Sequence, residues 1–111
     1  PFAANAEKLS GKDKKAFINY GQNQCPANML EKAKTDRRML AFKEMAKENN
    51  IKNVEKIVMI PAFKMYCDCM VTMVNIDIED HIDYVKNTCV PLMQNEVRTR
   101  IKAEIYLNNQ N

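Results

Sequence analysis

Apolar residues recur along most of the chain at the spacing of one face of a helix. Between Phe63 and Val74 they occupy positions i, i+3, i+4, i+7 and i+11, which is typical of an amphipathic helix. Sustained alternation of apolar and polar residues is absent from the sequence, and the strand-like patch from Ile76 to Ile78 is interpreted as a connection between helices. The pattern predicts an all-α fold, a compact bundle of four to five helices.

Cap residues divide the first half of the chain. Ser10 is a suitable N-cap for a first helix, and Gly21 is expected to end that helix. Cys25-Pro26 opens a second helix with proline in its first turn, where the missing N–H has no cost. This second helix is predicted to continue to Glu48, with a bend at Thr35-Asp36.

Prolines and acidic caps divide the second half. Asn53 is expected to cap a third helix, which Pro61 must kink or restart because a proline inside a helix removes a hydrogen bond. Asp77 is expected to cap a fourth helix. Pro91 should break the fourth helix, and a fifth is predicted over residues 95–107.

Length and charge narrow the possible classes of protein. A chain of 111 residues is expected to form a single helical domain, residues 1–111, with a frayed polar tail at residues 108–111. The 17 basic residues exceed the 14 acidic ones by only three and are spread along the chain, so we expect no nucleic-acid binding. No run of about 18 apolar residues is present, so no membrane span is predicted.

The four cysteines, Cys25, Cys67, Cys69 and Cys89, are the most specific feature of the sequence. An even number of cysteines in a small domain of exported type favours two disulfides over free thiols. The start at Pro1-Phe2 fits a mature chain from which a signal peptide has been removed. We therefore expect a secreted, extracellular protein stapled by two disulfides.

The pairing of the cysteines is partly restricted by their spacing. Cys67 and Cys69 stand two apart on a predicted helix, so their side chains leave the axis about 200° apart and cannot easily bridge each other. Two pairings remain, and we favour Cys67 with Cys89 and Cys25 with Cys69, because Cys67 and Cys89 lie on apolar stripes. The alternative is a zinc site of four thiolates with His81, although structural zinc usually uses paired knuckles.

Catalytic chemistry is poorly represented in the sequence. His81, the single histidine, stands amid Asp77, Glu79, Asp80 and Asp83, and is interpreted as a surface histidine in the acidic first turns of a helix. Neither a nucleophile elbow nor a glycine-rich phosphate loop is present. The sequence therefore predicts a non-enzymatic protein, with no catalytic residue, cofactor or metal.

The eight methionines have two possible uses. They fall on several predicted helices beside the apolar stripes, so we interpret them chiefly as core-filling side chains. Thioethers also line adaptable binding surfaces. A helical, disulfide-bonded carrier of a small hydrophobic ligand, a lipid or an odorant, therefore stays open as an alternative function.

The cysteine layout is similar to that of one known family. Cys25-Pro26, Cys67-Asp68-Cys69 and Cys89, set on methionine- and lysine-rich helices, resemble the small salivary proteins of anopheline mosquitoes in the anophensin and albicin group. The resemblance implies a secreted, non-enzymatic inhibitor of host defence that binds and blocks the alternative-pathway complement convertase, a host protein complex. Some members are linked to the contact system instead. Insect odorant-binding proteins are a competing likeness, but their usual six cysteines do not fit.

An inhibitor of this kind would act through an exposed protein-binding surface rather than a cleft. We take two basic faces as candidates because they present charge to a partner. The partner-binding candidates are Arg37, Arg38, Lys43 and Lys47 on one face, and Arg98, Arg100 and Lys102 on the terminal helix. The sequence does not rank the two faces.

Overall fold

The computed structural model describes residues 11–110, and most of them are helical. In chain order the elements are α1 (Gly11–Asn23), α2 (Cys25–Ala33), α3 (Arg37–Glu48), the π-helical turn η1 (Glu55–Met59), α4 (Ile60–Asn75), α5 (His81–Tyr84), the π-helical turn η2 (Val85–Cys89) and α6 (Val90–Asn109). The predicted all-α fold is confirmed. The proposed cap Ser10, the first residues Pro1-Phe2 and the last residue Asn111 lie outside the described range.

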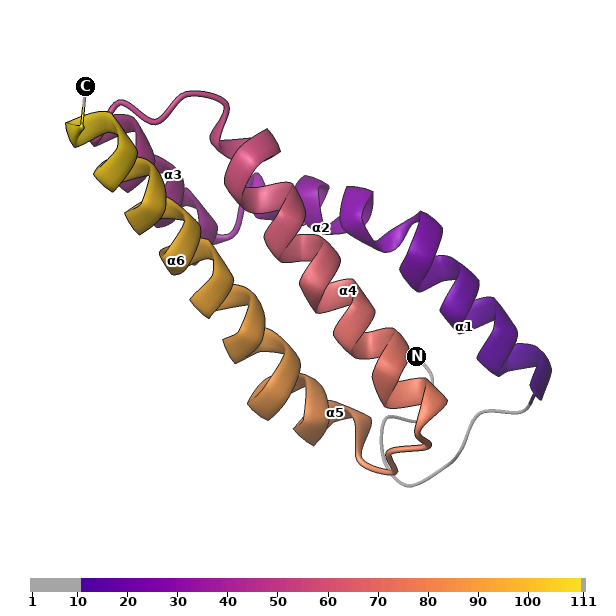
Figure 1. Ribbon diagram of the computed structural model, residues 1–111. Helices are drawn as coiled ribbons and strands as arrows, with labels where there is room; N and C mark the ends of the chain where they lie inside the picture. Colours follow the sequence, from indigo (N-terminus) through magenta and orange to yellow (C-terminus); the bar gives the residue numbers. More distant parts are fainter. Residues whose placement is uncertain (1–10, 111) are drawn as a thin grey trace.

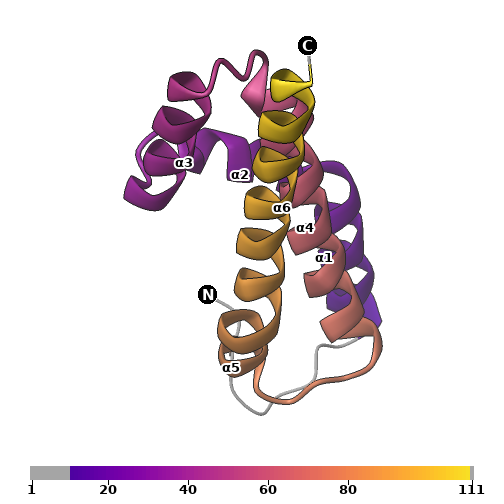
Figure 2. The same cartoon turned by 60° about the vertical axis from the view of Figure 1, so that its left-hand side comes forward.

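The long helices lie side by side with α4 in the middle. Figure 1 shows α1 on one side of α4 and α6 on the other, each running antiparallel to it. α2 follows the line of α1, whereas α3 stands away from the three long helices and packs mainly against α6 (Figure 2). The molecule is elongated, with dimensions of 52 × 23 × 23 Å. α4 is therefore the helix through which the rest of the fold is connected.

The core is rich in methionine and lies between α4, α6 and the α2–α3 region. Phe63 and Met59 are its largest fully buried side chains, and Val97 and Ile101 of α6 pack into the same cluster. Burying a side chain of this size stabilises the fold by roughly 1.5–3 kcal/mol. The interpretation of methionine as core filler is confirmed for four of the eight, which are buried: Met39, Met59, Met73 and Met93.

Both mid-chain prolines follow a π-helical turn. The Ile60 N–H donates to the Glu55 carbonyl, one residue further back than in an α-helix, and Pro61 comes next. The Val90 N–H likewise donates to the Val85 carbonyl directly before Pro91. The wider turn gives space near a proline ring that would otherwise clash with the preceding turn. The prediction that Pro91 breaks the helix is therefore wrong, because helical structure continues from His81 to Asn109.

Gly21 does not end the first helix. α1 continues to Asn23, and Gly21 is buried within it against α4. A Cβ atom added at Gly21 would lie 2.5 Å from the Cγ2 atom of Val71, a distance too short for two carbon atoms. The glycine is needed for the close approach of α1 to α4 and not for a C-cap.

Two aspartates, Asp36 and Asp80, act as N-caps, and neither was predicted as a cap. Residues 34–36 separate α2 from α3, so the predicted single helix is two helices, and the Asp36 carboxylate accepts hydrogen bonds from the N–H groups of Arg38 and Met39. The cap of α5 is Asp80, which accepts from the Asp83 N–H, and not Asp77. Asp77 has a left-handed backbone conformation, with φ of 55°, and belongs to the connection before α5.

The polar residues at the end of α6 contact the loop that follows α3. Asn108 and Asn109 continue α6, and the Asn108 side-chain amide donates to the Asn49 carbonyl at 3.2 Å and to the Asn50 carbonyl at 3.4 Å. These hydrogen bonds hold the end of α6 to the loop after α3. The frayed tail at residues 108–111 stays a prediction, although Asn108 and Asn109 are helical.

One stretch has the length and composition of a membrane-crossing helix, contrary to expectation. It is the 21-residue segment Glu55–Asn75, made of η1 and α4. The same stretch packs against α1, α2 and α6 as the central helix of the fold. Core helices of soluble proteins can have the same length and composition, so this observation is weak support for a membrane span.

Candidate functional site

Two disulfides tie α4 to its neighbours on both sides. Cys25 at the start of α2 is bonded to Cys67, with their Cα atoms 5.9 Å apart. Cys69 is bonded to Cys89 at the end of η2, with a Cα–Cα distance of 5.6 Å. The two bonds leave opposite sides of one helical turn, which holds α2, α4 and η2 in fixed positions.

The structure corrects the favoured pairing of the cysteines. The prediction that Cys67 and Cys69 are not bonded to each other is confirmed. The favoured pairing is wrong, because Cys67 is bonded to Cys25 and Cys69 to Cys89. Both members of the pair are buried, so an apolar stripe could not distinguish them. The pairing depends on which side of α4 is occupied by α2 and which by η2. This arrangement belongs to the tertiary structure and cannot be read from the spacing of the cysteines.

The zinc alternative has no support in the described part of the chain. All four thiols form disulfides, and His81 is not near a set of other ligands. Within residues 11–110 no group of three His, Cys, Asp or Glu side chains could hold a metal ion.

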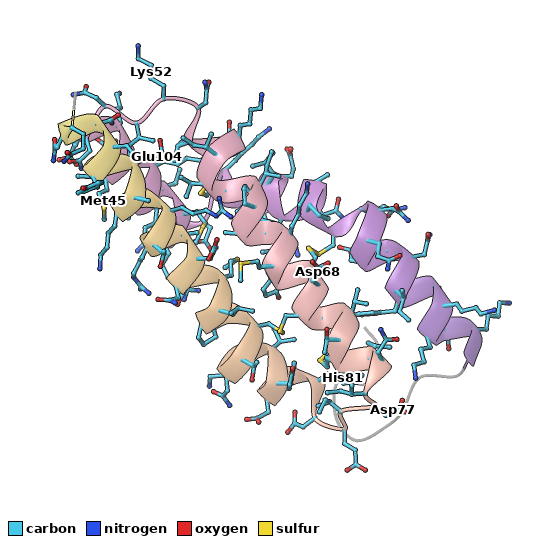
Figure 3. All side chains as sticks on the ribbon, in the orientation of Figure 1. Met45, Lys52, Asp68, Asp77, His81 and Glu104 are labelled. Carbon is cyan, nitrogen blue, oxygen red and sulfur yellow. A yellow bond between two sulfur atoms is a disulfide. The ribbon has the colours of Figure 1, made fainter. Side chains whose placement is uncertain are left out.

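An apolar groove with basic edges lies between α3 and α6, and we call it the α3–α6 groove. It is a hollow of about 150 Å³ lined by Phe42, Met45, Arg98, Ile101, Lys102 and Ile105. The Arg98 guanidinium lies over the Phe42 ring, 5.7 Å from its centroid, which is within cation–π range. Figure 3 shows Met45 at the end of the molecule opposite His81 and Asp77, and its side chain is 43% exposed.

Only part of the predicted basic surface belongs to this groove. Arg98 and Lys102, both from the predicted face on the terminal helix, line it. From α3 the lining residues are the apolar Phe42 and Met45, and none of the four predicted basic residues of that helix. Lys43 instead forms an ion pair with Glu55 of η1, with a distance of 3.5 Å between Nζ and Oε2.

The remaining predicted residues are distributed over other parts of the surface. Arg100 is paired with Glu96 four residues earlier in α6. Arg37 and Lys47 are exposed on α3, and Arg38 lines a different hollow. The two predicted faces therefore do not form one continuous basic patch. Sequence reasoning missed the apolar floor of the groove, although Phe42 and Met45 were visible as members of an apolar helical stripe.

A second concave region, which we call the α4 trough, lies between α2–α3 and the α4–α6 pair. It consists of two adjoining hollows of about 170 Å³ and 550 Å³ that share Arg38, Tyr66 and Val90. Met29 and Met93 are among the residues that line the smaller hollow, and the larger is lined by further apolar side chains of α4 and α5–η2. No sequence motif indicated the trough, because its walls come from four separate segments.

Two residues that line the trough, His81 and Tyr66, carry polar groups affected by burial. His81 is only 3% exposed, so the interpretation as a surface histidine is wrong. Burial also raises the pKa of the Tyr66 hydroxyl above its ordinary value of 10.0, with a smaller contribution from Tyr20. The Tyr66 hydroxyl is therefore neutral, and able to donate a hydrogen bond, over the whole physiological pH range.

Comparison with known proteins adds no assignment to this geometry. The chain matches no protein-family model, no curated protein and no solved structure.

Proposed function

We propose that this chain is a secreted, non-enzymatic inhibitor of host defence that binds the alternative-pathway complement convertase and blocks it. The cysteine layout carries the proposal, because Cys25-Pro26, Cys67-Asp68-Cys69 and Cys89 are the residues on which the resemblance to anopheline salivary proteins depends. The two disulfides formed by these cysteines are compatible with an extracellular protein.

A rigid scaffold suits an inhibitor that works by occupying a surface. Two disulfides around one turn of α4 limit the movement of α2 and η2 relative to the central helix. A preorganised binder loses less conformational entropy when it associates, so more of its contact energy contributes to affinity.

We place the partner-binding surface at the α3–α6 groove. Its centre is apolar, with Phe42 and the exposed Met45, and Arg98 and Lys102 stand at its edge. An apolar centre with arginine at the edge is the usual composition of a protein interface. The cations would select a partner that presents carboxylates around an apolar side chain.

The first test is an alternative-pathway haemolysis assay with the purified, oxidised protein, run beside a classical-pathway assay. We expect dose-dependent inhibition of the alternative pathway and no inhibition of the classical pathway. Failure to inhibit the alternative pathway, or equal inhibition of both, would contradict the proposed target.

The second test locates the surface. Charge reversal in the variants Arg98→Glu and Lys102→Glu should each weaken inhibition by about tenfold, since like charges at an interface cost of the order of 1.4 kcal/mol or more. The matched control is Lys15→Glu, the same change of charge at an exposed position of α1, a helix that packs on α4 and α2. If the control loses as much potency as the groove variants, net charge and not this surface is responsible.

A further inference from the structure

The α4 trough combines apolar walls with cations at its rim. Met70, Val85 and Ile82 line the larger hollow, and Ile82 is 63% exposed although it is a large aliphatic side chain. A volume of about 550 Å³ is within the range of small-molecule sites. The trough therefore offers apolar surface to a ligand that is itself largely apolar.

The charges around the trough favour an anion. Lys32 and Arg38 line the smaller hollow and Lys86 lines the larger one, whereas Asp36 is the one carboxylate among the described lining residues. The Oδ1 atom of Asp36 already accepts two backbone N–H groups as the N-cap of α3. The lining thus has three cations against one carboxylate that is engaged in helix capping.

Arg38 stands where the two hollows meet, and its position is unfavourable for the helix that carries it. Arg37 and Arg38 begin α3, and the first turn of α3 contains no acidic residue. Cations at a helix N-terminus are repelled by the helix dipole, which favours anions there. The Asp36 carboxylate at the N-cap offsets part of this repulsion, and a bound anion near Arg38 would offset more of it.

We propose that the α4 trough binds a single-chain amphiphile with an anionic head group, of the long-chain fatty acid type, in monomeric form. The carboxylate pairs with the Arg38 guanidinium at the junction of the hollows, where Tyr66 also lines the wall. The hydrocarbon chain lies along the apolar walls between Met70 and Val85. This site is separate from the α3–α6 groove and does not depend on the complement proposal.

The test is calorimetric titration with palmitate below its critical micelle concentration. We expect saturable binding of one molecule per chain, and weaker binding of hexadecanol, which has the same chain length without the charge. The Arg38→Met variant should bind palmitate about tenfold less tightly, because it lacks the charge-assisted pair. The matched control is Arg37→Met, the neighbouring exposed arginine, which does not line either hollow.

A second variant keeps the test valid if Arg38→Met folds poorly. Ile82→Asp places a carboxylate at an exposed position of the larger hollow and should also weaken palmitate binding about tenfold. Equal binding of palmitate and hexadecanol, equal losses in Arg37→Met and Arg38→Met, or no binding of monomeric palmitate would each overturn the proposal. Binding to palmitate-containing phosphatidylcholine vesicles without binding of the monomer would also overturn it, since the ligand would then be a membrane surface.

Discussion

Gly21 of α1 lies so close to Val71 of α4 that no side chain fits between the two helices at this point: an added Cβ atom would be 2.5 Å from the Val71 Cγ2 atom. Val71 is β-branched and has little rotamer freedom in a helix, so it cannot easily move away. The close approach fixes α1 against the central helix on the side opposite α6 (Figure 1).

The Gly21→Ala variant is expected to destabilise the protein. Overpacking costs about 1–3 kcal/mol, and the better helix propensity of alanine returns about 1 kcal/mol, so we expect a net loss of roughly 1 kcal/mol in urea unfolding. The matched control is Gly11→Ala, since nothing lies within 4 Å of a Cβ atom at Gly11. Adding Val71→Ala to Gly21→Ala should recover part of the loss. An unchanged unfolding midpoint in Gly21→Ala would show that α1 does not pack as described.

Peptide mapping of the unreduced protein should identify the two disulfides. An endoproteinase that cleaves before aspartate separates Cys67 from Cys69 at Asp68. Mass spectrometry is expected to find one cross-linked pair with Cys25 and Cys67, and a second with Cys69 and Cys89. A cross-linked pair containing Cys25 and Cys69 would contradict the structure.

Removal of each disulfide should reduce stability by different amounts. In the chain-entropy model, the bond across 42 residues from Cys25 to Cys67 contributes about 4 kcal/mol, and the bond across 20 residues from Cys69 to Cys89 about 3 kcal/mol. Replacing both cysteines of one bond with alanine, measured by urea unfolding, should therefore be more damaging for the first bond. The opposite order would mean that packing around the sulfur atoms outweighs chain entropy.

Loss of the Asp36 cap should weaken α3. The Asp36→Ala variant leaves the N–H groups of Arg38 and Met39 without their acceptor and is expected to cost about 1 kcal/mol in thermal or urea unfolding. Asp36→Asn is the matched control, because asparagine is an equally good N-cap and the cost should fall to a few tenths of a kcal/mol. Equal losses in both variants would assign the effect to charge and not to capping.

The raised pKa of Tyr66 makes stability depend on pH in the alkaline range. The unfolded chain releases the tyrosine proton near 10.0, whereas the folded protein holds it to higher pH, so the unfolded state binds fewer protons in between. The free energy of unfolding should therefore fall as pH rises above about 10. Tyr66→Phe should reduce this fall, measured by urea unfolding at a series of pH values, and Tyr106→Phe, at an exposed position, should not. The same slope in all three proteins would contradict a raised pKa of the partly buried Tyr66.

Several features follow from the sequence because their causes are local. The apolar spacing from Phe63 to Val74 is enough to predict an α-helix with a buried face, and α4 occupies that segment. The angular separation of Cys67 and Cys69 on a helix excludes a bond between them without any knowledge of the neighbours. The positions of Arg98 and Lys102 on one side of the last helix are set by the same periodicity.

Other features depend on which helix lies beside which, and no local pattern contains that information. Gly21 has the same residue type as a C-cap glycine, and only the presence of Val71 across the interface makes it a contact position. Pro91 would end an isolated helix, yet the π-turn η2 and the bond of Cys89 to α4 carry the helix through it. His81 is buried, and Cys67 reaches Cys25 instead of Cys89, because the neighbours of α4 occupy particular sides of it.

The groove and the trough arise in the same way, since each is walled by segments far apart in the chain whose contact is a property of the packed fold.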